Sequence, residues 1–255
     1  INDIPNNKRK IHLHPIPLLG GTLIIFNLII TFFYFFLFEE RLLIDHLYYQ
    51  NSIKSFIVFI FVFTSLFLTG IIDDKFTLSP IKRLFIITFL IYILCATDYL
   101  LIVDNLKFSF LNLNLEFKQL SKIFTILCFI IFIISMNMFD GINLQSFLFY
   151  LKNFTTLLIM LNNFNLIIFS ILLNFVFFGY LNYKNKCFLG DSGSYLLSFF
   201  LGYYLIKLYN TNEILYSDYI VNFLFLPIID SIRVIIKRTM KKKSIFLPDN
   251  FHIHH

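Results

Sequence analysis

Long apolar runs follow one another from end to end of this chain, with short polar stretches between them. A helix needs roughly 20 apolar residues to cross a bilayer. The runs have about this length and are continuous rather than alternating, which favours helices over the strands of a barrel. We place eight of them approximately at 18–38, 53–72, 84–103, 120–139, 144–161, 164–182, 192–209 and 217–236.

The composition agrees with this pattern, because 58% of the residues are hydrophobic and only 14% are charged. A soluble domain of this length could not bury so much apolar surface. The expected fold class is therefore all-α: a polytopic helical membrane protein with about eight transmembrane helices, forming one domain over residues 1–255. Asp98 and Lys152 interrupt two of the runs, and we interpret both as side chains that reach the membrane interface.

Eight crossings place the connecting segments alternately on two sides of the membrane. One side receives the N-terminal tail, 73–83, 140–143, 183–191 and the residues from 237 onward. Fourteen of the 21 Lys and Arg residues lie there, counting Arg233 just inside the membrane. The positive-inside rule makes this side cytoplasmic. The same rule accounts for the net charge of +6, so no nucleic-acid partner is expected.

The unusual polar sequences all fall on this predicted cytoplasmic side, although its assignment used only apolar runs and basic residues. A single composite site is therefore expected, built from cytoplasmic loops. Its five clusters are RKIHLHPIPLLGG (9–21), DDKFTLSPIKRL (73–84), NMFDGIN (137–143), FLGDSGS (188–194) and LPDNFHIHH (247–255).

The second cluster opens with two adjacent carboxylates, Asp73 and Asp74. On a helix their side chains point about 100° apart. One could contact a metal or a phosphate while the other acts as a base; alternatively, the pair ends a helix at the water interface. Lys82 and Arg83, about two turns further on, offer countercharge or phosphate contacts.

The other clusters combine carboxylates or imidazoles with glycines. Glycines around Asp191 let the backbone approach a ligand closely, although a simple helix cap is the alternative. Asp140 precedes a glycine at a helix junction, which is also an ordinary turn sequence. Three imidazoles near the end of the chain are suited to phosphate contacts or acid–base chemistry, but adjacent histidines without nearby cysteines do not form a compact zinc site.

The kinds of side chain in the five clusters indicate the class of reaction. The three cysteines lie far apart and indicate neither a disulfide framework nor a thiolate site. Oxygen ligands without thiolates favour Mg²⁺ or Mn²⁺, and with basic residues they are the groups that handle phosphate. At the cytoplasmic face of a membrane protein, they suit a reaction between a water-soluble phosphate donor and a lipid phosphate.

In this order, the five clusters resemble the cytoplasmic motifs of the polyprenyl-phosphate N-acetylhexosamine-1-phosphate transferases, glycosyltransferase family 4. PIPLLGG and HIHH are more similar to the undecaprenyl-phosphate GlcNAc branch than to the muramoyl-pentapeptide branch. The resemblance implies Mg²⁺-dependent attack by a polyprenyl phosphate on the β-phosphate of a UDP-N-acetylhexosamine. The products would be a polyprenyl-diphospho-sugar and UMP. It also implies a plasma-membrane enzyme that initiates cell-wall or lipopolysaccharide synthesis.

Carried over by position, the resemblance makes Asp191 the magnesium ligand. Asp73 and Asp74 would lie at the phosphates, where one of the two activates the lipid phosphate; which one is left open. The remaining assignments concern substrate binding: Asn137, Asp140 and Asn143 at the nucleotide, Phe188 stacked on uracil, and His252, His254 and His255 at phosphate or sugar.

The chain also departs from the family pattern. Asn143 stands where the family often has a second Asp, and Asn250 stands where it has a basic residue. Family members usually have ten or eleven spans, so the domain is expected to be incomplete at both ends. The alternative function is an ion-coupled transporter, which would place acids near the membrane midplane; only Asp98 and Asp230 are candidates. A homodimer is left open.

Overall fold

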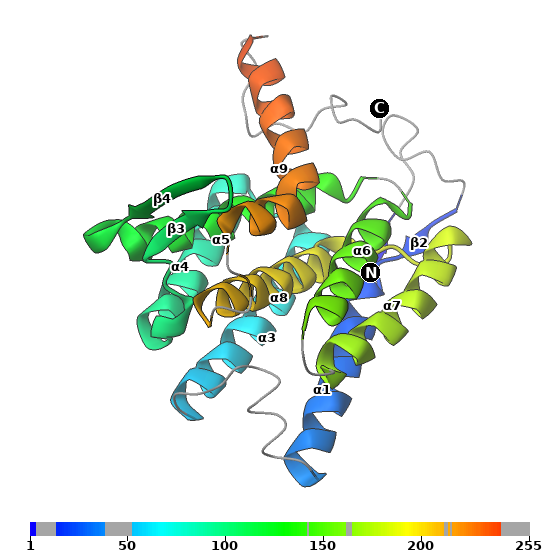
Figure 1. Ribbon diagram of the computed structural model, residues 1–255. Helices are drawn as coiled ribbons and strands as arrows, with labels where there is room; N and C mark the ends of the chain where they lie inside the picture. The colour runs from blue at the N-terminus through cyan, green and yellow to red at the C-terminus, as the bar shows by residue number, and fades with distance from the viewer. Residues whose placement is uncertain are drawn as a thin grey trace.

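The computed structural model describes residues 1–3, 14–38, 53–141, 143–161, 165–211, 214 and 216–240. Each predicted apolar run contains a helix (Figure 1). Among the described residues, five helices are long and apolar enough to cross a membrane, namely α3, α4, α5, α7 and α9, which confirms the predicted helical membrane fold. The helix bounds are α1 Gly20–Phe38, α3 Ile53–Phe76, α4 Pro80–Thr97, α5 Ser121–Phe139, α6 Gln145–Met160, α7 Leu166–Tyr183, α8 Gly190–Asn210 and α9 Ser217–Met240.

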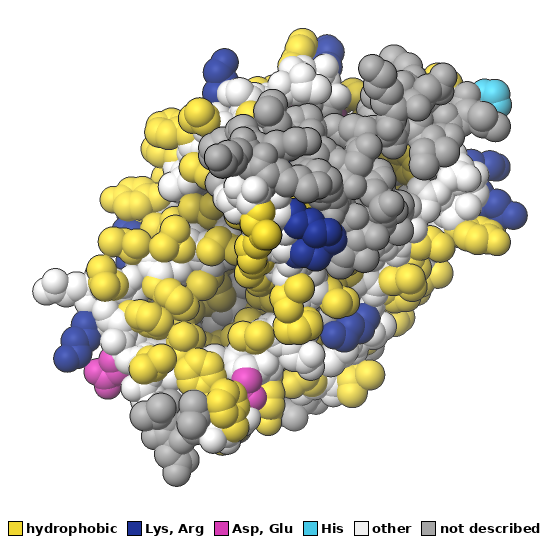
Figure 2. Space-filling model, turned by 90° about the horizontal axis from the view of Figure 1, so that it is seen from above, with side chains coloured by type: hydrophobic (Ala, Val, Ile, Leu, Met, Phe, Trp, Pro, Cys, Tyr) yellow, Lys and Arg dark blue, Asp and Glu magenta, His cyan; other side chains and the backbone are white. Residues whose placement is uncertain are grey.

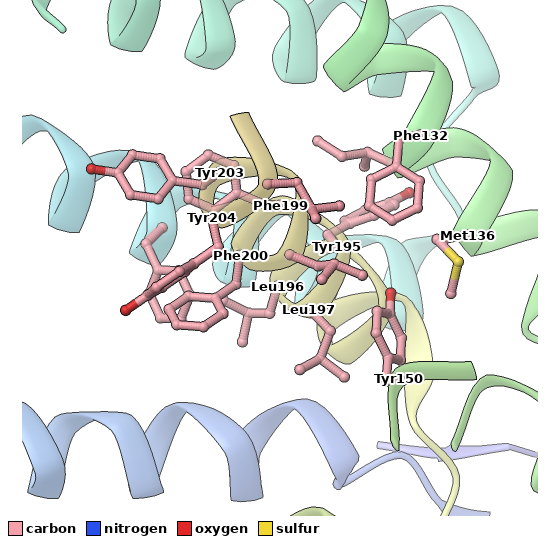
Figure 3. Packing of buried hydrophobic residues seen from close by; sticks show 14 of the residues in the cluster. Phe132, Met136, Tyr150, Tyr195, Leu196, Leu197, Phe199, Phe200, Tyr203 and Tyr204 are labelled. Carbon is pink, nitrogen blue, oxygen red and sulfur yellow. The ribbon is translucent and has the colours of Figure 1, made fainter. Parts of the chain in front are cut away.

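Helix α8 forms the centre of the bundle. Every residue from Ser192 to Tyr209 is buried, and α1, α3 and α5 pack against this helix. Figure 3 shows large side chains leaving α8 in several directions, among them Phe199, Phe200 and Tyr204. A helix that is apolar on all sides is expected at the centre of a bundle rather than at its surface.

Two glycines bring the neighbouring helices against the beginning of α8. A Cβ atom on Gly70 of α3 would lie 2.2 Å from the Cα atom of Ser192, and one on Gly21 of α1 would lie 2.5 Å from the amide nitrogen of Gly193. Neither site has room for a larger side chain. The first turn of α8 is therefore held between the end of α3 and the beginning of α1.

Short extended segments connect the first and fourth polar clusters. Strand β1, Asn2–Asp3, pairs antiparallel with β2, Ile16–Pro17. Leu18 then forms a parallel bridge with Phe188, and the Gly20 amide donates to the Phe188 carbonyl at 3.0 Å. The segment before α1 and the segment before α8 consequently lie side by side.

The other end of the bundle differs from the sequence expectation. Within the third apolar run, α4 ends at Thr97. A 3₁₀ turn, Tyr99–Leu101, follows this helix. Strands β3, Asn105–Phe108, and β4, Leu111–Glu116, then form an antiparallel hairpin that the apolar pattern did not predict. A second 3₁₀ turn, Lys118–Leu120, leads into α5.

The interpretation of Asp98 as a side chain at the membrane interface is wrong. Its carboxylate is buried and lies 2.7 Å from the Lys207 ammonium of α8, and it also accepts from the Leu100 amide at 3.1 Å. Burying a charge is costly unless it is paired, and a buried lysine provides the partner. Lys152, in contrast, is exposed.

Helix α9 contains Pro227 in its interior and bends along its length in Figure 1. A proline lacks the N–H that would bond to the carbonyl four residues earlier, here that of Phe223. The buried amide of Asn153 on α6 donates to this carbonyl at 3.2 Å. A side chain from a neighbouring helix thus satisfies the backbone acceptor that the proline leaves free.

Apolar side chains cover much of the face seen in Figure 2, and Lys and Arg side chains lie between them at several edges and near the middle. Large apolar residues such as Phe26, Phe33 and Phe85 are exposed on the helices. An apolar surface of this extent is expected where lipid surrounds a protein.

Candidate active site

The polar clusters meet where α3 and α5 end and where α4 and α8 begin. The described residues include most of the second, third and fourth clusters and the PIPLLGG part of the first. His252, His254, His255 and Asn250 lie outside the described residues, and their assignments stay predictions.

Asp73, near the end of α3, is 2% exposed and has four donors around its carboxylate. Arg83 of α4 contacts both oxygens, with Nη2 at 3.0 Å from Oδ1 and Nε at 2.8 Å from Oδ2. The Leu78 amide donates to Oδ1 at 2.9 Å, and the Tyr195 hydroxyl of α8 donates to Oδ2 at 2.8 Å. Both oxygens of Asp73 therefore lie within ion-pair distance of the Arg83 guanidinium, and one of them accepts a hydrogen bond from it.

Asp74 makes different contacts, as the 100° separation of adjacent helical side chains requires. It accepts from the backbone amides of Asp191 at 2.8 Å and of Ser192 at 3.3 Å. A carboxylate at the beginning of a helix satisfies amides that have no partner within the helix. Gly190 has φ of +74°, and a Cβ atom there would lie 2.9 Å from Asp74 Oδ2, so only glycine suits this turn.

Asn137, in the last turn of α5, connects the second and fourth clusters. Its amide oxygen accepts from Arg83 Nη1 at 3.1 Å, and its amide nitrogen donates to Asp191 Oδ1 at 2.5 Å. The structure therefore brings Asp73, Arg83, Asn137 and Asp191 into one connected network.

Asp191, in the first turn of α8, is half-buried. Desolvation raises the pKa of its carboxyl to about 7; the nearby carboxylates of Asp74 and Asp73 act in the same direction, whereas Arg83 and Asn137 oppose the shift. A cation at this carboxylate would relieve the repulsion among three acids.

The residues around Asp191 fit a hard cation. Its Oδ1 atom accepts from Asn137, and no donor within the described part of the chain contacts its Oδ2 atom. Among the described residues, no three His, Cys, Asp or Glu side chains form a group that could hold a metal by themselves. Mg²⁺ is commonly held by one or two carboxylates together with substrate phosphates and water, which matches this arrangement.

Asp140 lies at the end of α5 and accepts a hydrogen bond from the Ser146 hydroxyl of α6. Burial raises the pKa of its carboxyl to about 6; the Ser146 contact opposes the shift, and Asp74 adds to it. Asp74 accepts from the Asp191 amide, and Asn137, three residues before Asp140, donates to the Asp191 carboxylate, so the second, third and fourth clusters meet at Asp191.

Two other predicted substrate contacts occupy the adjoining loops. Asn143 is exposed and its amide nitrogen donates to the Asn185 side chain. Phe188 lies in the bridge to Leu18 described above. Asn182 of α7 joins these loops, because it accepts from the Leu144 amide at 2.7 Å and donates to the Cys187 carbonyl at 2.9 Å.

Sequence reasoning missed Tyr195 and Asn182. Tyr195 follows Asp191 by four residues, so both lie on the same face of α8, and this spacing could have identified it. Asn182 lies within an apolar run, where a lone amide carries no signal of its partner. Arg83 was expected to offer countercharge or phosphate contacts, and its ion pair with Asp73 confirms the first of these.

The two acids that a transporter would use are both paired within the described structure. Asp98 contacts Lys207 as described above. Asp230 of α9 contacts Arg233 one turn later at 2.8 Å. Neither arrangement leaves an isolated carboxylate in an apolar environment.

Comparison with known proteins agrees with this site. The sequence model of glycosyl transferase family 4 matches residues 56–209, which contain the three clusters that form the network. A probable undecaprenyl-phosphate N-acetylglucosaminyl 1-phosphate transferase of Bacillus subtilis (strain 168) is 26% identical over 262 residues, which cover 99% of this chain and 68% of the relative. The chain therefore belongs to glycosyl transferase family 4, and it is a multi-pass membrane transferase rather than an ion-coupled transporter.

Proposed function

We propose that this enzyme transfers an N-acetylhexosamine-1-phosphate from a UDP-sugar to a polyprenyl phosphate, giving a polyprenyl-diphospho-sugar and UMP. The observation that carries the proposal is the network of Asp191, Asn137, Arg83 and Asp73, with Asp74 beside it, at one end of a membrane helix bundle. The name of the Bacillus subtilis relative supports undecaprenyl phosphate as the acceptor and N-acetylglucosamine as the sugar.

In the proposed reaction, a phosphate oxygen of the lipid attacks the β-phosphorus of the UDP-sugar. The bond between the β-phosphorus and the oxygen that bridges to the α-phosphate breaks, and UMP leaves with that oxygen. Two substrates with several negative charges must approach one another, so the site has to offset their repulsion. Arg83, which is partly exposed, contributes positive charge next to Asp191.

Asp191 would hold Mg²⁺, or Mn²⁺, together with phosphate oxygens; the bound cation would neutralise charge that develops on the phosphates. Asn137 orients that carboxylate through its 2.5 Å contact. Asp140, Asn143 and Phe188 are proposed to bind the nucleotide, and His252, His254 and His255 to contact phosphate or sugar. The basic residues on this side support a site that faces the cytoplasm from the plasma membrane, where the product would start a cell-envelope polysaccharide.

The test uses membranes that contain the full-length protein, supplied with polyprenyl phosphate and one UDP-sugar at a time. UMP release should require both substrates and Mg²⁺, and it should be fastest with UDP-N-acetylglucosamine. Asp191→Asn should lower turnover by at least about 100-fold, since even removing a group that merely orients a metal ligand costs about 10- to 100-fold. UMP release without added polyprenyl phosphate in lipid-depleted protein would argue against the proposed acceptor.

Asp218→Asn is a matched control. Asp218 is likewise an acceptor in the first turn of its helix, with the Ser109 amide donating to it at 2.9 Å, but it lies at the beginning of α9, at the opposite end of the bundle. This variant should keep wild-type turnover. If Asp191→Asn also kept it while remaining folded, the metal assignment would be wrong.

A further inference from the structure

The hydrogen bonds around Asp73 form a closed ring. From Tyr195 on α8 the ring passes to Asp73 on α3, Arg83 on α4 and Asn137 on α5, and it returns to α8 at Asp191. Its donor–acceptor distances lie between 2.5 and 3.1 Å. We refer to these five side chains as the polar ring. It starts and ends on one helix, four residues apart, and connects that helix to three others.

The Asp73 carboxylate is enclosed by protein donors. It accepts three hydrogen bonds, from the Leu78 amide and Arg83 Nη2 at Oδ1 and from the Tyr195 hydroxyl at Oδ2. Arg83 Nε lies 2.8 Å from Oδ2 and adds an ion-pair contact. Its 2% exposure leaves no face open to an incoming phosphate.

The reaction also does not require this carboxylate to take a proton. The second pKa of a phosphate monoester is about 6, so a lipid phosphate is largely a dianion at neutral pH and can attack without a base. A buried carboxylate that pairs with arginine is better suited to fixing the direction of the guanidinium. Through Asn137, that direction determines where the Asp191 carboxylate points.

We propose that Tyr195 and Asp73 are positioning residues: together they hold Arg83 against Asn137, and thereby orient Asp191 toward the metal and phosphates. This inference rests on the proposed function and deepens it. It assigns Asp73 to the support of the metal site instead of proton transfer, and it gives a role in the reaction to Tyr195, which is buried and donates to Asp73.

The decisive variant is Tyr195→Phe, which removes one hydroxyl and keeps the buried aromatic side chain in place. Binding of Mn²⁺ in the presence of UMP is measured on the purified full-length protein by electron paramagnetic resonance. Loss of the hydroxyl should weaken binding by about 10- to 100-fold, as for other groups that orient metal ligands. The Mg²⁺ concentration for half-maximal turnover should rise in parallel, with little change in KM for the UDP-sugar.

Tyr209→Phe is the matched control on the same helix. Tyr209 is also buried and its hydroxyl also makes hydrogen bonds, to the Asn105 carbonyl at 2.9 Å and from the Lys107 amide at 3.0 Å. These contacts lie at the far end of α8. The control should cost stability without changing Mn²⁺ binding.

Mn²⁺ binding separates the two roles of Asp73. If Asp73 accepted a proton from the lipid phosphate, removing the Tyr195 hydroxyl would lower turnover and leave Mn²⁺ binding as in the wild type. A positioning role predicts that Mn²⁺ binding weakens together with turnover. Unchanged Mn²⁺ binding in Tyr195→Phe would overturn the inference.

Two further outcomes keep the inference separate from the proposed function. If the wild-type protein transfers no sugar phosphate at all, the proposed function fails, but the Mn²⁺ measurement still decides whether the polar ring supports a metal site. If Tyr195→Phe does not fold, Arg83→Lys serves instead. Lysine keeps the charge, but it cannot contact the two Asp73 oxygens and the Asn137 amide oxygen at the same time. It should weaken Mn²⁺ binding to a similar extent; wild-type binding in this variant would contradict the inference.

Discussion

Two carboxyl groups at the active site hold protons more tightly in the folded protein than in the unfolded chain. Burial raises the pKa of Asp191 from 3.8 to about 7 and that of Asp140 from 3.8 to about 6. A raised pKa means that the folded state binds more protons than the unfolded state across this interval. The stability that these groups contribute is therefore fully present below about pH 4 and is lost as the pH rises through 6 and 7.

This sign leads to a test on metal-free protein in detergent with a chelator. Between pH 5.5 and pH 8, the midpoint of thermal unfolding should fall more steeply for the wild type than for Asp191→Asn, because asparagine does not ionise. At pH 8, Mg²⁺ with UMP should raise the wild-type midpoint, since a ligand that binds only the folded state stabilises it. Equal slopes in the two proteins would show that Asp191 does not titrate in this interval.

Among the helices, α9 shows how a broken backbone hydrogen bond is replaced inside a membrane protein. Pro227 leaves the Phe223 carbonyl without its helical donor, and Asn153 of α6 donates to it at 3.2 Å. Asn153 is fully buried. The contact depends on geometry: the amide reaches this carbonyl because Asn153 on α6 lies beside Phe223 on α9.

The contact can be tested with a double-mutant cycle. Asn153→Leu should lower the free energy of unfolding by about 1–3 kcal/mol, the cost of leaving a buried acceptor without a donor. In a Pro227→Ala background the new N–H can reach the Phe223 carbonyl, so the same Asn153→Leu change should cost clearly less. Both values are measured by detergent-induced unfolding.

Asn174→Leu is a suitable comparison for that cycle. Asn174 also donates to a helix carbonyl, that of Leu23 at 3.3 Å, but residue 27, four positions later, is not a proline. The expected loss is only about 0.6 kcal/mol, the average for such interhelical hydrogen bonds in membranes. A Pro227→Ala background that left the cost of Asn153→Leu unchanged would contradict this account of α9.

At the scale of the whole molecule, the central helix carries a charged structure at each end. The polar ring and Asp74 lie at its beginning, and the ion pair of Lys207 with Asp98 lies near its end, beside the hairpin of β3 and β4. The two ends have different chemistry. The first has an incompletely bonded carboxylate at Asp191, whereas the second is a closed, buried pair that contributes to the position of α8.

Changes at the closed pair should therefore affect stability and not the metal site. Lys207→Met leaves Asp98 charged and buried, which should cost about 3–5 kcal/mol. Adding Asp98→Asn removes the charge and keeps an acceptor for the Leu100 amide, so the double variant should recover most of that loss. Turnover per folded molecule and Mn²⁺ binding should match the wild type in both. A double variant as unstable as the single one would show that the charge is not the cause.

The parts of the fold that could be predicted are those that depend on residues close together in the sequence. Each of the eight apolar runs contains a helix, because the length and continuity of an apolar run are properties of neighbouring residues. The hairpin of β3 and β4 was missed because a criterion of long apolar runs does not detect short strands, although the strict alternation of apolar and polar residues in LNLNLE, Leu111–Glu116, is a strand pattern. The family was also predicted correctly, from five short clusters that occur in a fixed order.

The sequence by itself therefore determined the class of the protein, the approximate helices and the residues that carry chemistry. Only the tertiary structure decided how those residues are paired. Asp73 and Asp74 are adjacent in the chain, yet one is enclosed by Arg83 and Tyr195 and the other caps α8. Asp98 forms an ion pair with Lys207, which is more than a hundred residues away in the sequence. The physical reason is that hydrogen-bond saturation and charge pairing depend on which helices pack together, and no single apolar run contains that information.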